Sequence, residues 1–246
     1  MLRSLNELFG YSIAAVDGDL GKVHDFLFDE ILWIARYLVV DTGGWLPGKK
    51  VLLVPSSLGE PDWKTQTFPV NLNKEMVENS PEIAEDMPVS RQHEIELHKH
   101  YRWIPYWTVG VRVGEVVPPS AAKEEKKEEE TDKKEGDPYL RSIREVTGYH
   151  IHATDGDIGH VEDFIADVRT WMVRYMVVDT KNWLPGRKVL VAPDWIDRIS
   201  WPDSKVQVDL SREKIKNSPE FNPSEPINRK YEERLYDFYG RPKYWL

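Results

Sequence analysis

Apolar and polar residues alternate over short stretches in much of the chain, a pattern typical of β-strands. The first 72 residues predict five short strands, at Tyr11–Val16, Gly21–Asp29, Arg36–Asp41, Lys50–Pro55 and Thr67–Leu72. Asp17-Gly18 favours a hairpin turn after the first strand, and Pro47-Gly48 favours a type II turn before the fourth. The second strand carries apolar residues on both faces, so the pattern does not decide which of its faces points into the core. Short strands joined by tight turns indicate a small barrel or sandwich.

Helical signals follow the strands, and a short amphipathic piece precedes them at Leu2–Gly10. Asn73 is a suitable N-cap for a helix that Ser80-Pro81 would end. Near the end of the chain, residues 228–239 place Tyr231, Leu235, Phe238 and Tyr239 on one helical stripe. The pattern therefore predicts a β-barrel followed by a short C-terminal helical arm.

The whole unit occurs twice. Residues 2–107 align without a gap on residues 140–245, and about 46 of the 106 aligned positions are identical. Lys123–Glu135, between the copies, are almost all Lys and Glu, which is typical of a solvated linker. We expect a first repeat over residues 1–108, a charged flexible linker over 109–138 and a second repeat over 139–246. Because the counterpart of Leu2–Val16 lies in mid-chain, we expect that segment to belong to the fold and not to a secretory signal.

Composition and charge exclude several classes of function. The 246 residues include no Cys, which excludes disulfides, thiol nucleophiles and Cys-ligated metal sites. The net charge is −9, and an acidic chain lacks the basic surface that sequence-independent nucleic-acid binding requires. No apolar run approaches the ~20 residues of a membrane-spanning helix. These features favour a cytoplasmic protein that does not bind nucleic acid.

The repeated motifs resemble the PRC-barrel family, named after the cytoplasmic barrel of the photosynthetic reaction-centre H subunit. The residues that carry the resemblance are DGDLGKVHDFLFD with DGDIGHVEDFIAD, RYLVVDT with RYMVVDT, and KVLLVP with KVLVAP. The resemblance implies a mainly β fold of two small PRC-type β-barrels, each followed by its helical arm. It carries no catalytic signature. Family members include membrane-complex subunits and ribosome-maturation factors, so it implies binding to other proteins.

Tryptophan is the most unusual residue type, with 10 in the chain. Eight of them match between the repeats, in the pairs Trp33/Trp171, Trp45/Trp183, Trp63/Trp201 and Trp107/Trp245. Trp supplies buried area in a core and also anchors interfaces. Trp45 and Trp183 lie in Gly/Pro-bounded loops and fit either role equally. The candidate interface residues are Trp45, Pro47, Trp107, Trp183, Pro185, Tyr231, Tyr239 and Trp245.

Matching carboxylates form a second candidate set, a candidate acidic face of Asp25, Asp29, Asp163 and Asp167. Carboxylates on barrel strands can conduct protons or bind a partner. They also form structural ion pairs, which perturb acids as active sites do. Arg36 and Arg174 are suitable partners, so the structural interpretation is favoured.

Catalytic and metal-binding patterns are missing from the sequence. It holds no phosphate-binding Gly-rich loop, no GxSxG and no HExxH, and the seven His are not placed as three or four metal ligands. We therefore expect no enzyme activity, no cofactor and no metal. The favoured hypothesis is an interaction or scaffold protein whose repeats pair within the chain as a pseudo-dimer, with an unidentified protein partner and a possible homo-oligomer. The alternative is a photosynthesis- or electron-transport-linked protein related to the reaction-centre H subunit, with acidic residues aiding proton transfer at a membrane complex.

Overall fold

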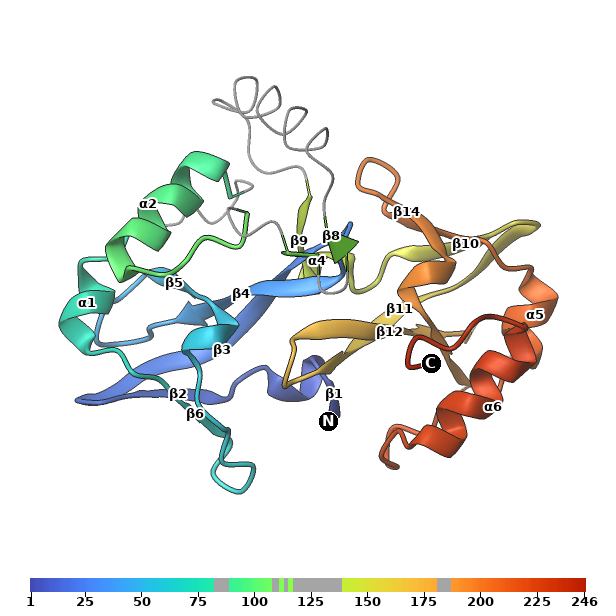
Figure 1. The fold of residues 1–246 in the computed structure, drawn as a ribbon, viewed down its shortest axis with the longest axis horizontal. Coiled ribbons are helices and arrows are strands. Elements are labelled where there is room, and N and C mark those ends of the chain that lie inside the picture. The colour runs from blue at the N-terminus through green and yellow to red at the C-terminus, as the bar shows by residue number, and fades with distance from the viewer. Residues whose placement is uncertain (82–88, 108–110, 113–114, 117–138, 181–186) are drawn as a thin grey trace. The chain divides into compact units, whose positions relative to one another are not determined.

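The computed structural model describes residues 1–81, 89–107, 111–112, 115–116, 139–180 and 187–246, and its fold is mainly β (Figure 1). This mainly β fold confirms the class that the alternating pattern predicts. Most of the predicted linker, residues 109–138, lies outside the described residues. Within it, β7 (Val111–Arg112) pairs with β8 (Glu115–Val116).

The first repeat contains the five predicted strands in the predicted order, and a short strand that the pattern did not predict precedes them. Its elements are β1 (Leu2–Ser4), η1 (Asn6–Leu8), β2 (Ser12–Ala15), β3 (Gly18–Asp29), β4 (Ile34–Asp41), β5 (Lys50–Leu53), η2 (Pro55–Ser57), β6 (Thr67–Pro69), α1 (Lys74–Glu78) and α2 (Arg91–Tyr101). Asn73 caps α1 as predicted, since its side chain accepts from Met76 N. Ser90 does the same for α2 through His93 N.

The second repeat has the same order with one further strand. Its elements are β9 (Leu140–Ser142), α4 (Ile143–Val146), β10 (His150–Ala153), β11 (Gly156–Asp167), β12 (Met172–Asp179), β13 (Lys188–Val191), η3 (Pro193–Trp195), β14 (Ile196–Ser200), β15 (Lys205–Val208), α5 (Arg212–Asn217) and α6 (Arg229–Tyr239). The sequence pattern did not predict β14, which pairs with β15. The corresponding part of the first repeat contains Gly59 and Pro61, which weaken a strand, and forms only isolated bridges.

The chain forms two compact units that do not follow the two repeats. Unit 1 comprises Met1–Phe9, Asp25–Arg36 and Arg141–Leu246, and unit 2 comprises Gly10–His24 and Tyr37–Leu140. Unit 1 therefore combines most of the second repeat with two segments of the first. Strands β3 and β4 each contribute residues to both units.

Within unit 1, antiparallel pairs join β14 to β15, β10 to β11, β11 to β12 and β12 to β13. A parallel pair joins β10 to β15. β1 of the first repeat adds to β11 in antiparallel register, with Leu2 opposite Asp167. Within unit 2, β2 pairs with β3 and β4 with β5 in antiparallel register, while β2 and β6 are parallel.

An irregularity in β11 explains why no single inward face could be predicted for the second strand of each repeat. The register against β12 shifts between Val161 and Asp163. Such a bulge moves alternate side chains to the other face, and Val161 and Phe164 are both fully buried. In β3, Val23 and Phe26 are likewise both buried. The face that packs inward thus changes within the strand.

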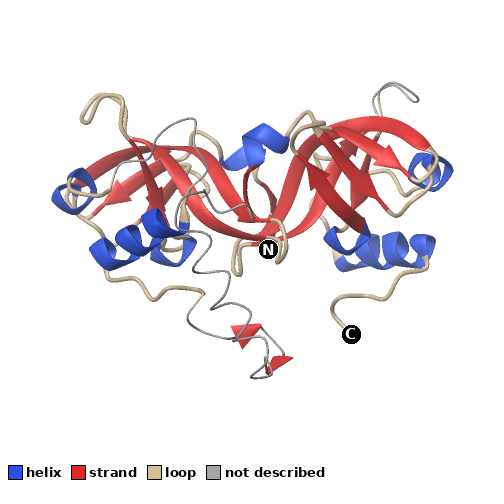
Figure 2. Cartoon of the chain, turned by 90° about the horizontal axis from the view of Figure 1, so that it is seen from above, coloured by secondary structure: helices blue, strands red, loops and turns tan. Residues whose placement is uncertain are grey.

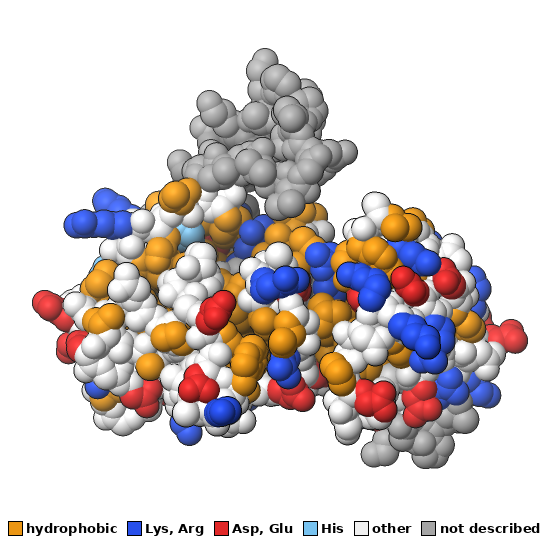
Figure 3. Space-filling view, turned by 60° about the horizontal axis from the view of Figure 1, so that its bottom comes forward, with side chains coloured by type: hydrophobic (Ala, Val, Ile, Leu, Met, Phe, Trp, Pro, Cys, Tyr) orange, Lys and Arg blue, Asp and Glu red, His pale blue; other side chains and the backbone are white. Residues whose placement is uncertain are grey.

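The helices lie on the outside of the strands of each unit (Figure 2). On the face drawn in Figure 3, apolar side chains are interspersed with Lys, Arg, Asp and Glu side chains. The exposed large apolar residues described by the structure include Val16, Ile31, Ile104 and Phe238.

Two matching glycines allow a close backbone approach. Gly21 has φ +133°, and a Cβ at this position would lie 2.0 Å from Asp41 O. At Gly159, with φ +66°, a Cβ would lie 2.1 Å from Asp179 O. Only glycine combines these backbone angles with this proximity at low cost.

We predict that Gly21→Ala and Gly159→Ala each lower the free energy of unfolding by about 2 kcal/mol or more, because the strand must move away from its neighbour. Urea denaturation of each variant measures the change. Gly44→Ala is the matched control, since a Cβ there has no atom within 4 Å, and we expect it to change stability by less than about 0.5 kcal/mol. Equal effects at Gly21 and Gly44 would contradict the prediction.

Candidate functional site

The turns that contain Trp33 and Trp171 meet inside unit 1. Ala35 N donates to Trp171 O at 2.8 Å, and Val173 N donates to Trp33 O at 2.7 Å. Ile34 and Met172 lie opposite each other in antiparallel register. Each Trp has a left-handed backbone, with φ 55° and 58°, and each turn is closed by an N–H bond to the preceding Asp29 O or Asp167 O. The repeats thus exchange the same backbone bonds in both directions, and we call this region the exchange junction.

Aromatic rings fill the space beneath the exchange junction. The Phe26 ring lies 5.8 Å from the Trp171 ring, and the Phe28 ring lies 5.3 Å from Trp33 and 5.6 Å from Phe164. Phe26, Phe28 and Phe164 are completely buried. Close aromatic pairs of this kind add to the free energy of burial. The junction is therefore a hydrophobic core built from both repeats.

Two carboxylates bind the helix that begins the other repeat. Asp25 accepts hydrogen bonds from Ser142 Oγ at 2.5 Å and from Arg144 N at 3.1 Å, at the start of α4. Asp163 accepts the same pair of bonds from Ser4 Oγ at 2.5 Å and from Asn6 N at 3.1 Å, at the start of η1. N–H groups in the first turn of a helix lack a partner within the helix, so a carboxylate there satisfies them.

Burial dominates the electrostatics of these two carboxylates. It raises the pKa of Asp25 against the opposing effects of the hydrogen bonds from Ser142, Arg144 and Phe26. It raises the pKa of Asp163 to about 6, although Ser4, Asn6 and Phe164 donate to it. Asp25 is buried and Asp163 half-buried. The two carboxylates lie inside the junction between repeats and are not part of an exposed acidic face.

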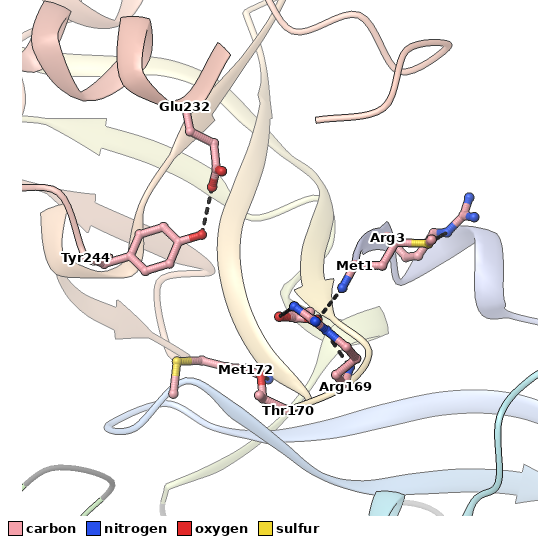
Figure 4. A network of polar contacts seen from close by, with 8 residues as sticks. Met1, Arg3, Arg169, Thr170, Met172, Glu232 and Tyr244 are labelled. Carbon is pink, nitrogen blue, oxygen red and sulfur yellow. Dashed lines mark hydrogen bonds and ion pairs between the residues drawn. The ribbon is translucent and has the colours of Figure 1, made fainter. Parts of the chain in front are cut away.

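The other two residues of the candidate acidic face lie at the adjoining turns. Asp29 pairs with Arg36 at 3.0 Å and accepts from the backbone of Ile31 and Leu32. Asp167 accepts from the Met1 amino group at 2.6 Å and from Arg169 N at 3.2 Å. Figure 4 labels the two donor residues, Met1 and Arg169. Burial would raise the pKa of Asp167, but these hydrogen bonds outweigh it and lower that pKa to about 2. Both carboxylates therefore stabilise turns.

A further ion pair joins the repeats close to Asp29. Arg141 Nη2 lies 2.5 Å from Glu30 Oε1, and the Arg141 guanidinium also lies over the Trp201 ring at 4.8 Å. A guanidinium that binds a carboxylate and an aromatic ring at once loses less freedom for each contact formed. The pair adds specificity to the junction.

A buried polar cluster holds each helical arm. In unit 2, Glu94 accepts from Tyr37 Oη at 2.7 Å and Tyr106 Oη at 2.8 Å, and it pairs with Arg91 at 2.7 Å. Glu94 is 0% exposed, so these donors compensate for the loss of water around its carboxylate. The cluster joins β4, α2 and the segment that follows α2.

Unit 1 contains the corresponding cluster around α6. Glu232 accepts from Tyr175 Oη at 2.8 Å. Figure 4 shows the second bond, which Glu232 accepts from Tyr244 Oη at 2.7 Å. Glu232 also pairs with Arg229 at 3.1 Å. The same residue types thus dock the arm in both repeats. Glu94 and Glu232 were missed as site residues, although an Arg three positions before each Glu and a Tyr twelve positions after it recur in both repeats.

The candidate interface residues on the arms contact their own unit. The Trp107 ring lies under Arg91 at 4.6 Å, and the Trp245 ring lies under Arg229 at 4.0 Å. Tyr239 is buried 4.5 Å from the Trp195 ring, and Tyr231 donates to Pro219 O at 3.1 Å. These four side chains are buried or half-buried.

The candidate loop residues are only partly described. Trp45 is half-buried, donates from Nε1 to Leu20 O at 2.8 Å, and has Lys74 Nζ 5.2 Å from its ring. Pro47 is exposed. Trp183 and Pro185 lie outside the described residues. The hydrogen bond from Trp45 therefore joins the first of these two loops to β3.

Neither a metal cluster nor a membrane-spanning helix is found in the described parts of the chain. There, no three His, Asp or Glu side chains lie close enough together to hold a metal ion. No helix in the same parts is long and apolar enough to cross a membrane.

Comparisons with known proteins add no relative. No family model matches the sequence, and no curated protein matches it. The function must therefore be inferred from the geometry of the exchange junction and of the arms.

We predict that Glu94→Gln lowers the free energy of unfolding by about 2 kcal/mol or more, because it removes the buried negative charge that pairs with Arg91. Glu232→Gln should cost less, because the Arg229 side chain is 49% exposed and that of Arg91 only 27%. Thermal denaturation measures both. Glu233→Gln, at the adjacent exposed position, is the control and should be nearly neutral. A larger loss for Glu233→Gln than for Glu94→Gln would argue against a stabilising role of the cluster.

We also predict a pH dependence of stability that comes from Asp163. Its folded pKa of about 6 lies above the ordinary value of 3.8 for an Asp side chain. The contribution of Asp163 is thus fully present below about pH 4 and is lost as the pH rises through 6. Asp163→Asn, which keeps the shape and an acceptor oxygen, should reduce the loss of stability between about pH 4 and pH 7. Urea denaturation across this pH range measures it.

The control for this prediction is Asp203→Asn, at an exposed position. It should leave the pH dependence unchanged. If Asp163→Asn has the same pH profile as the unchanged protein, the carboxylate is not the group responsible.

Proposed function

We propose that this chain is a non-enzymatic interaction or scaffold protein in which two PRC-barrel-like repeats pair as a pseudo-dimer within one polypeptide. The observation that carries the proposal is the reciprocity of the exchange junction. Ala35 N bonds to Trp171 O while Val173 N bonds to Trp33 O, and Asp25 and Asp163 each bind the opposite repeat. A surface that contacts an equivalent surface in this way is characteristic of a two-fold dimer.

The assignment of a barrel to each repeat belongs to this proposal. It is supported by the parallel pairing of the second strand of each repeat with its last strand, β2 with β6 and β10 with β15. Strands distant in sequence must come together in this way when a sheet curls towards closure. The same pairing fits the resemblance of the repeated motifs to the PRC-barrel family.

The chemistry of the described residues supports a binding role over catalysis. The buried carboxylates of the junction and of the arms are occupied by hydroxyl, backbone and guanidinium donors. A catalytic acid or base needs access to a substrate. These carboxylates are instead enclosed by neighbouring donors, and the expected partner is another protein.

The alternative role, proton transfer by acidic residues at a membrane complex, has less support. A proton path needs groups that exchange protons with one another or with water. Asp25 and Asp163 instead each accept three hydrogen bonds from neighbouring donors. Asp29 and Asp167 are held in turns.

We predict that cleavage of the linker leaves the two halves associated. A protease site introduced within residues 123–135 would separate the repeats covalently. Analytical ultracentrifugation should then find a single species with the mass of both halves, since the junction buries aromatic rings from each. Two monomeric species would overturn the pseudo-dimer.

A variant tests whether the junction holds the halves together. Asp25→Ala with Asp163→Ala removes both carboxylates that bind the opposite repeat, and the cleaved halves should then dissociate more readily. Glu233→Ala is the control, since this residue is exposed on α6. If the two variants dissociate equally, the junction carboxylates do not contribute to pairing.

A further inference from the structure

We propose that His98 makes the docking of the α2 arm pH-dependent, and that the α6 arm of the other repeat lacks this dependence because Tyr236 takes the corresponding position. The α2 arm comprises residues 91–107, and the α6 arm comprises residues 229–245. The inference goes beyond the proposed pairing of repeats, since it concerns the attachment of each arm within its own unit.

His98 lies in the interior of unit 2, between the helix and the rings that follow it. It is 3% exposed. Its ring contacts the Trp107 ring at 4.8 Å and the Trp103 ring at 5.8 Å, both edge to face. It is therefore the point at which α2, the segment after it and β4 meet.

The hydrogen bonds around His98 fit a neutral imidazole. Tyr37 Oη donates to Glu94 Oε1 at 2.7 Å, so its oxygen is free to accept from His98 Nε2 at 3.0 Å. The network thus assigns the proton of the neutral ring to Nε2. A second proton would add a positive charge in a buried site that already holds the Arg91 guanidinium.

The charged and titratable groups that face His98 come from three places. Arg91 and Glu94 lie on α2 itself, Tyr37 lies on β4, and Tyr106 lies after the helix. Arg91 already pairs with Glu94 at 2.7 Å, and both tyrosines donate to the same carboxylate. Glu94 therefore already accepts three hydrogen bonds before any charge appears on His98.

The pKa of His98 agrees with this geometry. Burial lowers it from 6.5, the Arg91 charge lowers it further, and the backbone of Trp103 and Ile104 opposes both. In an undocked arm, the pKa of His98 would have its ordinary value. Because the undocked state then binds more protons below about pH 6.5, acid weakens docking, by at most about tenfold for each pH unit.

The α6 arm provides an internal comparison. Tyr236 is 2% exposed and packs edge to face on Trp195 at 5.2 Å and on Trp245 at 5.1 Å. Burial raises its pKa above the ordinary value, so it is neutral throughout the acidic range. The three His of α2, at 93, 98 and 100, correspond to Tyr231, Tyr236 and Phe238 in α6.

Acid acts in the opposite direction at the exchange junction. The pKa values of Asp25 and Asp163 are raised, so protonation of these groups favours the folded junction. A loss of protection confined to the α2 arm at low pH therefore points to the histidines of that arm and not to general acid unfolding. Burial also lowers the pKa of His93, so variants of both residues are needed to identify His98.

Hydrogen exchange of the full chain, measured by mass spectrometry at about pH 7.5 and pH 5.0 and corrected for intrinsic rates, tests the proposal. We expect protection of residues 91–107 to fall by about tenfold or more at the lower pH, while residues 229–245 keep theirs. His98→Tyr should remove the fall, and Tyr236→His should produce one in residues 229–245. His93→Gln tests the other α2 histidine whose pKa burial lowers, and most of the fall should remain in this variant because His98 is the more deeply buried of the two.

Two results would overturn the proposal. One is an equal fall in both arms, and the other is a fall that persists in His98→Tyr or disappears in His93→Gln. If His98→Tyr does not fold, His98→Phe takes its place, with the same expected loss of pH dependence. The imidazole signals of His98 provide a second measurement, and a titration near pH 6.5 with the arm still protected would also overturn the proposal.

Discussion

The reciprocal pairing of the Trp33 and Trp171 turns is the constraint on which the rest of unit 1 depends. Each turn needs a left-handed backbone at its Trp to present the carbonyl oxygen that the other repeat binds. A left-handed conformation costs a bulky residue roughly 1–2 kcal/mol, and the paired bonds and buried rings offset that cost. The turns therefore stabilise each other.

The carboxylates of the junction add direction to this hydrophobic contact. Aromatic packing alone tolerates small shifts, whereas Asp25 and Asp163 each require a hydroxyl and a helix N–H at fixed distances. Burying a carboxylate raises its pKa and costs free energy at neutral pH. Such groups contribute more to the specificity of pairing than to its strength, which fits an interaction protein with one defined arrangement.

The polar clusters of the α2 and α6 arms share most of their residues and differ at one position. Both retain the buried Glu with its two Tyr donors and its Arg. The two clusters differ at one position of the helix, which holds His98 in the first repeat and Tyr236 in the second. A single difference within a cluster that both repeats share can thus give one arm a response to pH that its counterpart lacks.

The sequence by itself determined the two repeats, most of their strands, the Asn73 cap and the presence of helices after the strands, because these follow from local periodicity, Asp-Gly turns and side chains next to a helix start. Only the tertiary structure decided which carboxylates are buried and that segments of the first repeat belong to unit 1. The bond between Ser4 and Asp163 joins residues 159 positions apart. No local pattern encodes a contact of that kind, since it exists only when distant strands meet and exclude water.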